Sequence, residues 1–178
     1  MKAKDFRKLL DDDTQPCATH FWNRQLNVCT YRQHWELAFN STQETRLRVL
    51  RWKVLHNIYP TNTLLYKMSI ANTNKCNVCA VDKTEYIEHF FFGCTKIKPV
   101  WRVVEQEISK RTGTHLEISE TIGLLGFLDN AHTAREQKII NQLILIARIC
   151  IGKCRYANGP NLDIIFDKEL ALRSHLLR

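Results

Sequence analysis

The chain has 178 residues and a formal net charge of +8, and its sequence pI is about 9.2. Its hydrophobic share of 44% and charged share of 25% exclude a disordered chain and suit one domain with at most a small subdomain. The longest apolar run, residues 143–151, is too short to span a bilayer, and the first residues lack the apolar block of a signal peptide. Together with an odd number of cysteines, seven, this composition predicts a protein of the nucleus or the cytoplasm.

Residues 1–40 are predicted to form an N-terminal segment of short, interrupted helices. An amphipathic stretch over residues 3–10 ends at three consecutive aspartates, which are typical of an exposed helix end rather than a catalytic metal site. Residues 18–26 and 31–39 each place aromatic side chains at helical spacing. We expect these rings to anchor a hydrophobic core: Phe21, Trp22, Trp35 and Phe39.

The pattern Ser41-x-x-Glu44 is a capping box and predicts a strong helix from residue 42 to about residue 58, ended by Pro60. Apolar residues recur on one face of this helix and predict a buried stripe: Leu47, Leu50, Val54 and Ile58. Trp52 and His56 lie on a second apolar edge and are expected to be packed. Basic residues flank the stripe: Arg46, Arg48, Arg51 and Lys53. Such flanks suit a helix between a core and a phosphate backbone, but any solvated helix of a basic protein shows them too.

The most specific pattern lies between residues 75 and 99, where Cys76-x2-Cys79 is followed after nine residues by His89-x4-Cys94. A two-residue gap lets two thiolates of one turn reach the same ion, and a later His–Cys pair completes a tetrahedron of three sulfurs and one nitrogen. Thr84 is a candidate N-cap for a short helix that brings His89 and Cys94 toward the cysteine turn. The spacing therefore predicts one zinc ion; the alternative is three reduced, buried thiols beside an ordinary histidine.

Several more helices are predicted after Pro60. Thr61 caps a helix over residues 62–69, and Thr95 starts a helix that runs to about residue 110, with a proline tolerated in its first turn. Residues 112–130 are predicted to be irregular, with one short helix. The capping box Thr133-x-x-Glu136 opens the longest helix, which runs to about residue 157, and residues 161–177 form a last amphipathic helix.

The longest predicted helix carries two cysteines, Cys150 and Cys154, four positions apart. Such a pair can bind a metal, but without companion ligands nearby we expect two core thiols. Asn141, Arg148 and Arg155 are predicted to lie on the face opposite the apolar residues. The whole chain is therefore predicted to be mainly α, a multi-helix domain with an embedded Cys3His zinc-binding turn and short helix, organised as residues 1–40, 41–111 and 112–178.

Positive charge is concentrated in the middle of the chain. Residues 41–111 hold twelve Lys or Arg against six Asp or Glu, and so carry +6 of the net +8. An anionic partner would bind there, and nucleic acid is the first candidate, although the charge could also serve solubility alone. Tyr86 or Phe91 could stack on an unpaired base, but each is more often a core residue. The predicted phosphate contacts are Arg46, Arg48, Arg51, Lys53, Lys67, Lys96, Lys98 and Arg102.

The run RLRVLRWKVLHNIYPTNTLLYK (residues 46–67), followed by Cys-x2-Cys, EYIEHFFFGC and a tryptophan seven residues after the last cysteine, resembles one known family. It is similar to the zinc-binding region at the C-terminal end of reverse transcriptases from non-LTR retrotransposons of the long interspersed element type. The likeness covers residues 35–108. The tail, with GLLGFLDN and ILIARICIGKCRYANG, is also similar to the C-terminal segment of vertebrate elements of this kind.

This resemblance implies a zinc-dependent domain that binds RNA or single-stranded DNA and supports target-primed reverse transcription, in which an element's RNA is copied onto nicked genomic DNA. It also implies that the zinc ligands are Cys76, Cys79, His89 and Cys94. The interval between Cys79 and His89 is slightly longer here than in many relatives. The alternative is a non-catalytic docking domain with a purely structural zinc, whose helical tail packs on a partner such as the polymerase domain of a reverse transcriptase.

No catalytic constellation is recognisable in the sequence. Polymerase chemistry needs paired aspartates that hold two magnesium ions, and the segment Phe127-Leu-Asp129-Asn130 lacks the second aspartate. Asp129 and Asn130 are better interpreted as capping residues, and an endonuclease site is equally hard to find. We therefore expect no catalysis on this chain, and we interpret it as a domain or remnant of a reverse transcriptase.

Overall fold

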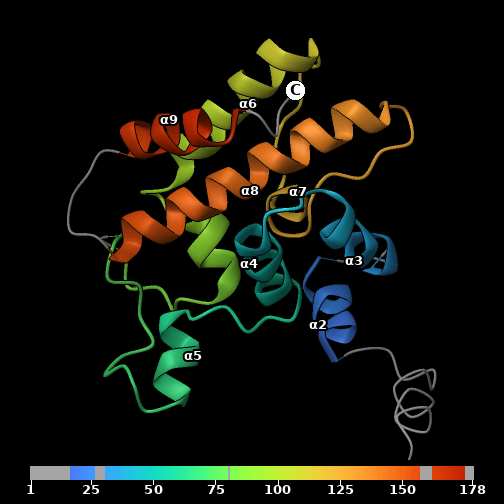
Figure 1. Cartoon of the computed structure of the whole chain (residues 1–178). Helices are drawn as coiled ribbons and strands as arrows, with labels where there is room; N and C mark the ends of the chain where they lie inside the picture. Colours follow the sequence, from blue (N-terminus) through green and yellow to red (C-terminus); the bar gives the residue numbers. More distant parts are fainter. Residues whose placement is uncertain (1–16, 27–30, 80, 157–161, 175–178) are drawn as a thin grey trace, which may run out of the picture. The chain divides into compact units, whose positions relative to one another are not determined.

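The computed structural model describes residues 17–26, 31–79, 81–156 and 162–174 (Figure 1). Over these residues the regular structure is helical, apart from one isolated antiparallel bridge between Lys75 and Thr84. This confirms the mainly α prediction; the helix predicted over residues 3–10 lies outside the described residues. The chain divides into two compact units, residues 1–31 and residues 32–178. None of the described helices has the length and apolar character needed to cross a membrane.

The first unit contributes α2 (Cys17–Leu26), which corresponds to the helix predicted over residues 18–26. Its two neighbouring aromatic rings, Phe21 and Trp22, meet edge to face with their centroids 4.9 Å apart. Trp22 is fully buried, as expected of a core anchor, and Phe21 is half-buried.

The next helix, α3 (Tyr31–Asn40), confirms the prediction for residues 31–39. Trp35 on this helix is half-buried and packs edge to face on His56, with the ring centroids 4.8 Å apart. The side chain of Phe39, the other predicted anchor, lies outside the described residues. The His56 ring also contacts Trp52, which was expected to be packed but is 41% exposed.

Helix α4 (Thr45–Leu55) begins three residues later than predicted, because the expected capping box does not form. Glu44 is the N-cap residue but makes no capping hydrogen bond with its side chain. Ser41 is buried, and its hydroxyl accepts a hydrogen bond from Arg51 instead. The predicted stripe is buried at Leu47, Leu50 and Val54. Ile58 lies beyond the end of the helix and is exposed, so its assignment to the stripe was wrong.

Helices α5, α6 and α7 follow α4. Helix α5 (Asn62–Lys67) is capped as predicted, since the Thr61 hydroxyl accepts from the backbone of Leu64. Helix α6 (Lys98–Thr112) has proline in its first turn but begins after a turn over residues 95–97, and therefore later than the predicted start at Thr95. Helix α7 (Glu120–Leu125) is the short helix expected between residues 112 and 130, and the Ser119 hydroxyl caps it.

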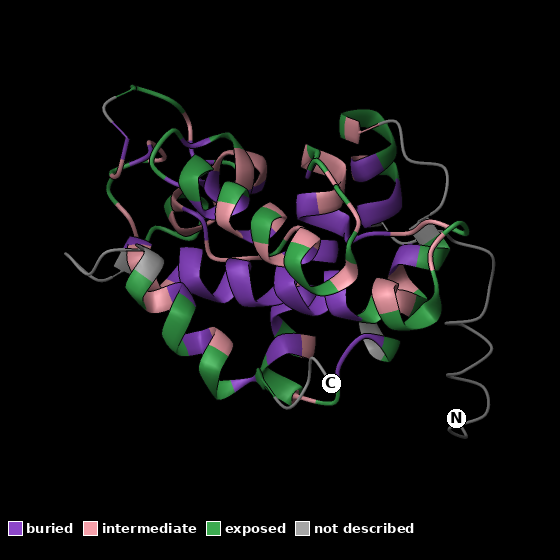
Figure 2. Cartoon of the chain, turned by 90° about the horizontal axis from the view of Figure 1, so that it is seen from above, coloured by how far each residue is buried: buried purple, intermediate pink, exposed green. Residues whose placement is uncertain are grey.

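Helix α8 (Ala134–Tyr156) is the long helix against which α4, α6 and α9 (Leu162–Leu172) pack (Figure 1). Its capping box is confirmed: the Glu136 carboxylate accepts from the backbone and hydroxyl of Thr133, and the Thr133 hydroxyl accepts from the backbone of Glu136. Residues 139–152 are all buried, and Figure 2 shows this buried helix crossing the second unit. Cys150 is fully buried and Cys154 half-buried, and both are free thiols.

The polar residues of α8 are buried too, which corrects their predicted place on an exposed face. A helix with neighbours on all sides has no solvent face, so its polar side chains must find partners inside the fold. Asn141 pairs with both backbone groups of Phe127, accepting from its N–H at 2.9 Å and donating to its carbonyl at 2.9 Å. Arg148 donates from Nε to the carbonyl of Gly123 at 2.9 Å. Arg155 extends to the segment that carries Cys76 and Glu85.

Candidate metal centre

Cys76 and Cys79 lie on a loop whose two ends are held together by backbone pairing. The Lys75–Thr84 bridge is flanked by hydrogen bonds from the Cys76 N–H to the Lys83 carbonyl and from the Glu85 N–H to the Asn74 carbonyl, each 2.8 Å long. Thr84 is therefore part of this bridge, and its predicted role as a helix N-cap was wrong. The pairing closes the loop and directs both thiols to one side of it.

His89 and Cys94 stand at the two ends of a π-helical turn, η1 (His89–Gly93). The Cys94 N–H donates to the His89 carbonyl at 3.0 Å, which is an i+5 to i hydrogen bond. A π-helical turn holds more residues than an α-helical turn, so residue 94 lies almost directly above residue 89. In an α-helix residue 94 would lie further around the helix axis. Phe90 and Phe91 hold the turn in place, because both are buried and both rings contact Tyr59. Phe91 is thus a core residue and Tyr86 an exposed one.

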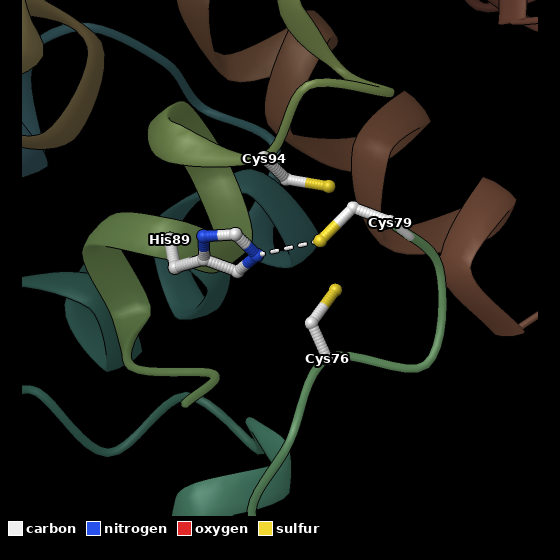
Figure 3. A group of neighbouring side chains, drawn as sticks. All are labelled: Cys76, Cys79, His89 and Cys94. Atoms are coloured by element: carbon white, nitrogen blue, oxygen red, sulfur yellow. Dashed lines mark hydrogen bonds between the residues drawn. The ribbon is translucent and has the colours of Figure 1, made fainter. Parts of the chain in front are cut away.

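The four predicted ligands converge. Figure 3 shows the imidazole of His89 and the three thiols directed toward one point, and their ligand atoms all lie within 4.8 Å of one another. The Cys79 Sγ and His89 Nε2 atoms are 3.4 Å apart. A tetrahedral zinc ion, with Zn–S of about 2.3 Å and Zn–N of about 2.0 Å, separates its ligand atoms by roughly 3.5–3.8 Å. The arrangement therefore fits one zinc ion after a small contraction.

The protonation state of His89 suits a metal, whereas Cys76 has to lose its proton on binding. Burial lowers the pKa of His89, with a further contribution from the positive charge of Arg155, so the imidazole is held in the neutral form that binds metals. Burial raises the pKa of the Cys76 thiol to about 11. A zinc ion replaces that proton, because the thiolate is the metal ligand. Four protein ligands fill a tetrahedron, which is the arrangement of structural zinc sites.

Two residues next to the ligands were missed in the sequence. Glu85 and Arg155 form an ion pair whose side chains are each 2% exposed, and Arg155 also reaches the sulfur of Cys76. Seventy positions separate the two residues in the sequence, so no local pattern links them. The helix carries several other charged residues, so the charge of Arg155 gave no signal of its own, and helical periodicity assigned it to the outside.

Most of the predicted nucleic-acid contacts lie at the surface, and one does not. Arg51 is 1% exposed and donates to the Ser41 hydroxyl at 3.1 Å and to the Leu125 carbonyl at 2.9 Å. A phosphate cannot reach this guanidinium, so Arg51 is removed from the predicted set. Arg48 is half-buried and donates to the Thr42 carbonyl at 2.7 Å. The others are exposed or half-buried: Arg46, Lys53, Lys67, Lys96, Lys98 and Arg102.

A buried Cys3His cluster, built on a bridged loop and a π-turn inside a helical unit, defines a zinc-binding domain. Residues 17–101 match the family described as zinc-binding in reverse transcriptase. This stretch of the chain is therefore a zinc-binding region of the reverse transcriptase type, as the sequence motifs indicated, and it contains all four ligands. No curated protein sequence matches the chain.

Proposed function

We propose that this chain is the zinc-stabilised nucleic-acid-binding region of a non-LTR retrotransposon reverse transcriptase. In this role it binds RNA or single-stranded DNA in the nucleus or the cytoplasm, and it supports target-primed reverse transcription without catalysing it. The zinc ion fixes the Cys76–Cys79 loop on the π-turn, since so short a loop buries too little surface to order itself. The basic residues around the zinc-binding region then supply the contacts to phosphate.

One observation carries this proposal. Six predicted contacts, Arg46, Lys53, Lys67, Lys96, Lys98 and Arg102, lie at the surface, and within the described part of the chain none of them forms an ion pair. Unpaired exposed cations bind phosphates with little loss of internal interactions, which is the main source of affinity for a nucleic-acid backbone.

Exposed aromatic rings add a second kind of contact. Tyr86 is 55% exposed and lies in the zinc-binding region, three residues before His89. Trp52 is exposed on α4, the helix that also carries Arg46 and Lys53. Aromatic side chains among cations stack on unpaired bases without reading their sequence, and this combination favours single-stranded nucleic acid.

Binding of the zinc-loaded protein to RNA and to single-stranded DNA, titrated across salt concentration, tests the proposal. The variant Arg46→Glu/Lys67→Glu/Arg102→Glu reverses three charges of the proposed surface. The variant Arg135→Glu/Lys138→Glu/Lys168→Glu reverses three exposed charges on α8 and α9 and is the matched control. Loss of three phosphate contacts should lower the slope of log affinity against log salt by about 2 for a single strand. Equal effects of the two variants would exclude the proposed surface.

The second candidate function is docking to a protein partner such as the polymerase domain. Apolar side chains at the end of α5 favour it, because Tyr66, Met68 and Ile70 are each more than half exposed. A folded protein with stoichiometric zinc that binds neither RNA nor DNA would support docking over nucleic-acid binding. Met68→Ser/Ile70→Ser should then weaken association with the polymerase domain and leave zinc content unchanged.

A further inference from the structure

Arg155, in the last turn of α8, contacts the metal centre from outside the matched zinc-binding region. Its Nη2 atom lies 3.1 Å from the sulfur of Cys76 and within hydrogen-bond distance of the Glu85 carboxylate. The guanidinium also lies over the ring of Phe90, 4.3 Å from its centroid. A side chain that is 2% exposed and contacts these three residues occupies a defined position.

The charges around the site explain why a cation is needed there. A zinc ion bound by three thiolates and one neutral histidine carries a net charge of −1. Glu85, buried beside Cys76, adds a second negative charge to the same region. Negative charge without compensation is costly in a buried position. Arg155 is the buried cation that contacts both the thiolate ligand and the carboxylate.

Glu85 is itself held in place by the metal-binding loop and α5. Its backbone N–H donates to the Asn74 carbonyl, and its Oε1 atom accepts from the backbone of Asn62 at 2.9 Å. The Asn62 side chain donates in turn to the Lys75 carbonyl at 2.7 Å. The carboxylate therefore has a fixed orientation beside the guanidinium of Arg155.

We propose that Arg155 is a positioning residue of the zinc centre, which donates a hydrogen bond to the Cys76 thiolate and thereby retains the zinc ion. The N–H···S contact draws negative charge from this one sulfur, and this protects it from electrophiles. Partners of this kind are part of a metal site as much as its ligands are. The zinc-binding region and helix α8 thus form one functional unit.

Zinc affinity and the reactivity of each cysteine test the proposal. Arg155→Gln removes the guanidinium and puts a shorter, uncharged amide in its place, which does not reach the Cys76 sulfur. It also leaves Glu85 buried without its ion-pair partner, so Arg155→Gln/Glu85→Gln is made alongside it to balance the charges. Arg135→Gln changes an exposed arginine in the first turn of the same helix and is the matched control. Zinc affinity is measured by competition with a chromophoric chelator. Alkylation of Cys76, Cys79 and Cys94 by iodoacetamide in the zinc-loaded protein is followed by mass spectrometry.

We expect both Arg155 variants to lose about 10- to 100-fold in zinc affinity. Cys76 should be alkylated faster relative to Cys94, because the lost hydrogen bond was to Cys76 alone. A merely structural effect of the substitution would loosen the site and expose all three cysteines to the same degree. That uniform pattern, or a charge-balanced variant with unchanged zinc affinity and Cys76 reactivity, would overturn the proposal.

Glu85→Gln alone separates the two contacts of Arg155. Glutamine keeps the acceptor for Asn62 and removes the charge that competes for the guanidinium. If Arg155 acts on the sulfur, zinc affinity in Glu85→Gln stays at or above the wild-type level. If Arg155 acts only by pairing with Glu85, zinc affinity falls as far as in Arg155→Gln, and the proposal fails.

Discussion

His34 and Arg51 share one acceptor, the backbone carbonyl of Leu125. The carbonyl accepts from Arg51 Nη2 at 2.9 Å and is 3.2 Å from His34 Nδ1. Leu125 is the last residue of α7, and the carbonyls at the end of a helix have no partner inside it. A residue of α3 and a residue of α4 thus complete the hydrogen bonding of α7. Since a carbonyl only accepts, the neutral His34 ring carries its proton on Nδ1.

This arrangement makes stability depend on pH. Burial and the nearby charge of Arg51 lower the pKa of His34 to about 4, against 6.5 for an ordinary histidine. Above pH 6.5 the ring is neutral in both the folded and unfolded states and has no effect. Below that pH the unfolded state binds a proton that the folded state does not, so the free energy of unfolding falls by up to about 3 kcal/mol by pH 4.

His34→Gln, which keeps a donor for the Leu125 carbonyl, should remove this contribution. Urea unfolding of both proteins between pH 7 and pH 4 measures it, and the difference between the two proteins cancels the loss of zinc that both undergo in acid. Parallel stability curves over this range would show that His34 does not carry the effect.

Removal of zinc should loosen the metal-binding loop more than the helices. Cys94→Ser, or treatment with a strong chelator, removes the link between the Cys76–Cys79 loop and the π-turn. We expect faster amide hydrogen exchange over residues 74–94 and little change over α8, which the fold buries without help from the metal. Cys154→Ser is the control, because it should leave both zinc content and exchange unchanged. A uniform rise in exchange over the whole unit would contradict this division.

Position 126 requires glycine, both for its backbone conformation and because its neighbours leave no room for a side chain. Its φ of 98° and ψ of 169° fall in a region that only glycine adopts readily. A Cβ atom there would lie 2.3 Å from Arg51 Nη2 and 2.7 Å from Asn141 Oδ1. Gly126→Ala should therefore lower the free energy of unfolding by roughly 3 kcal/mol or more, as measured in urea.

Gly113 is the matched position for that experiment. Its φ is 71°, but a Cβ atom there would meet no neighbour within 4 Å. Gly113→Ala should cost about 1–2 kcal/mol, which is the backbone strain alone. Equal losses for the two alanine variants would show that contacts with Arg51 and Asn141 do not constrain residue 126.

The side chain of Asn141 forms the hydrogen bonds with the backbone of Phe127 that another backbone segment would otherwise form. Asn141→Leu leaves the buried N–H and carbonyl of Phe127 without that partner, and it should lower the free energy of unfolding by roughly 2–4 kcal/mol. The same substitution at exposed Asn72 should change stability little. Urea unfolding compares the two variants. A loss at position 141 no greater than at position 72 would rule out this role.

The sequence predicted the parts of the molecule that depend on neighbouring residues. All four zinc ligands lie within nineteen residues, so their spacing alone indicated the site. The capping box at Thr133 formed because its hydrogen bonds span a single turn. Its counterpart at Ser41 did not, because a buried arginine ten residues away bonds to the serine hydroxyl. Hydrogen bonds between neighbouring residues determined the cap at Thr133, whereas a hydrogen bond within the core replaced the cap at Ser41.

The buried arginines could not be predicted, because periodicity assigns charged residues to the outer face of a helix. Arg51 and Arg148 instead donate to backbone carbonyls of α7, which lie 74 and 25 positions away in the sequence. Arg155 pairs with Glu85 across 70 positions. Each of these partners is brought close only by the packing of segments that are distant in the sequence, and packing is a property of the assembled fold.

The π-turn between His89 and Cys94 makes the two spacers of the metal centre unequal in their tolerance to change. One residue added to or removed from this turn would rotate Cys94 around the helix axis and carry its sulfur away from the other ligands. The other spacer is the interval between Cys79 and His89. Its residues 81–83 are exposed, so extra length there can extend into solvent. Insertions and deletions in related sequences should therefore accumulate between Cys79 and His89 and be absent between His89 and Cys94.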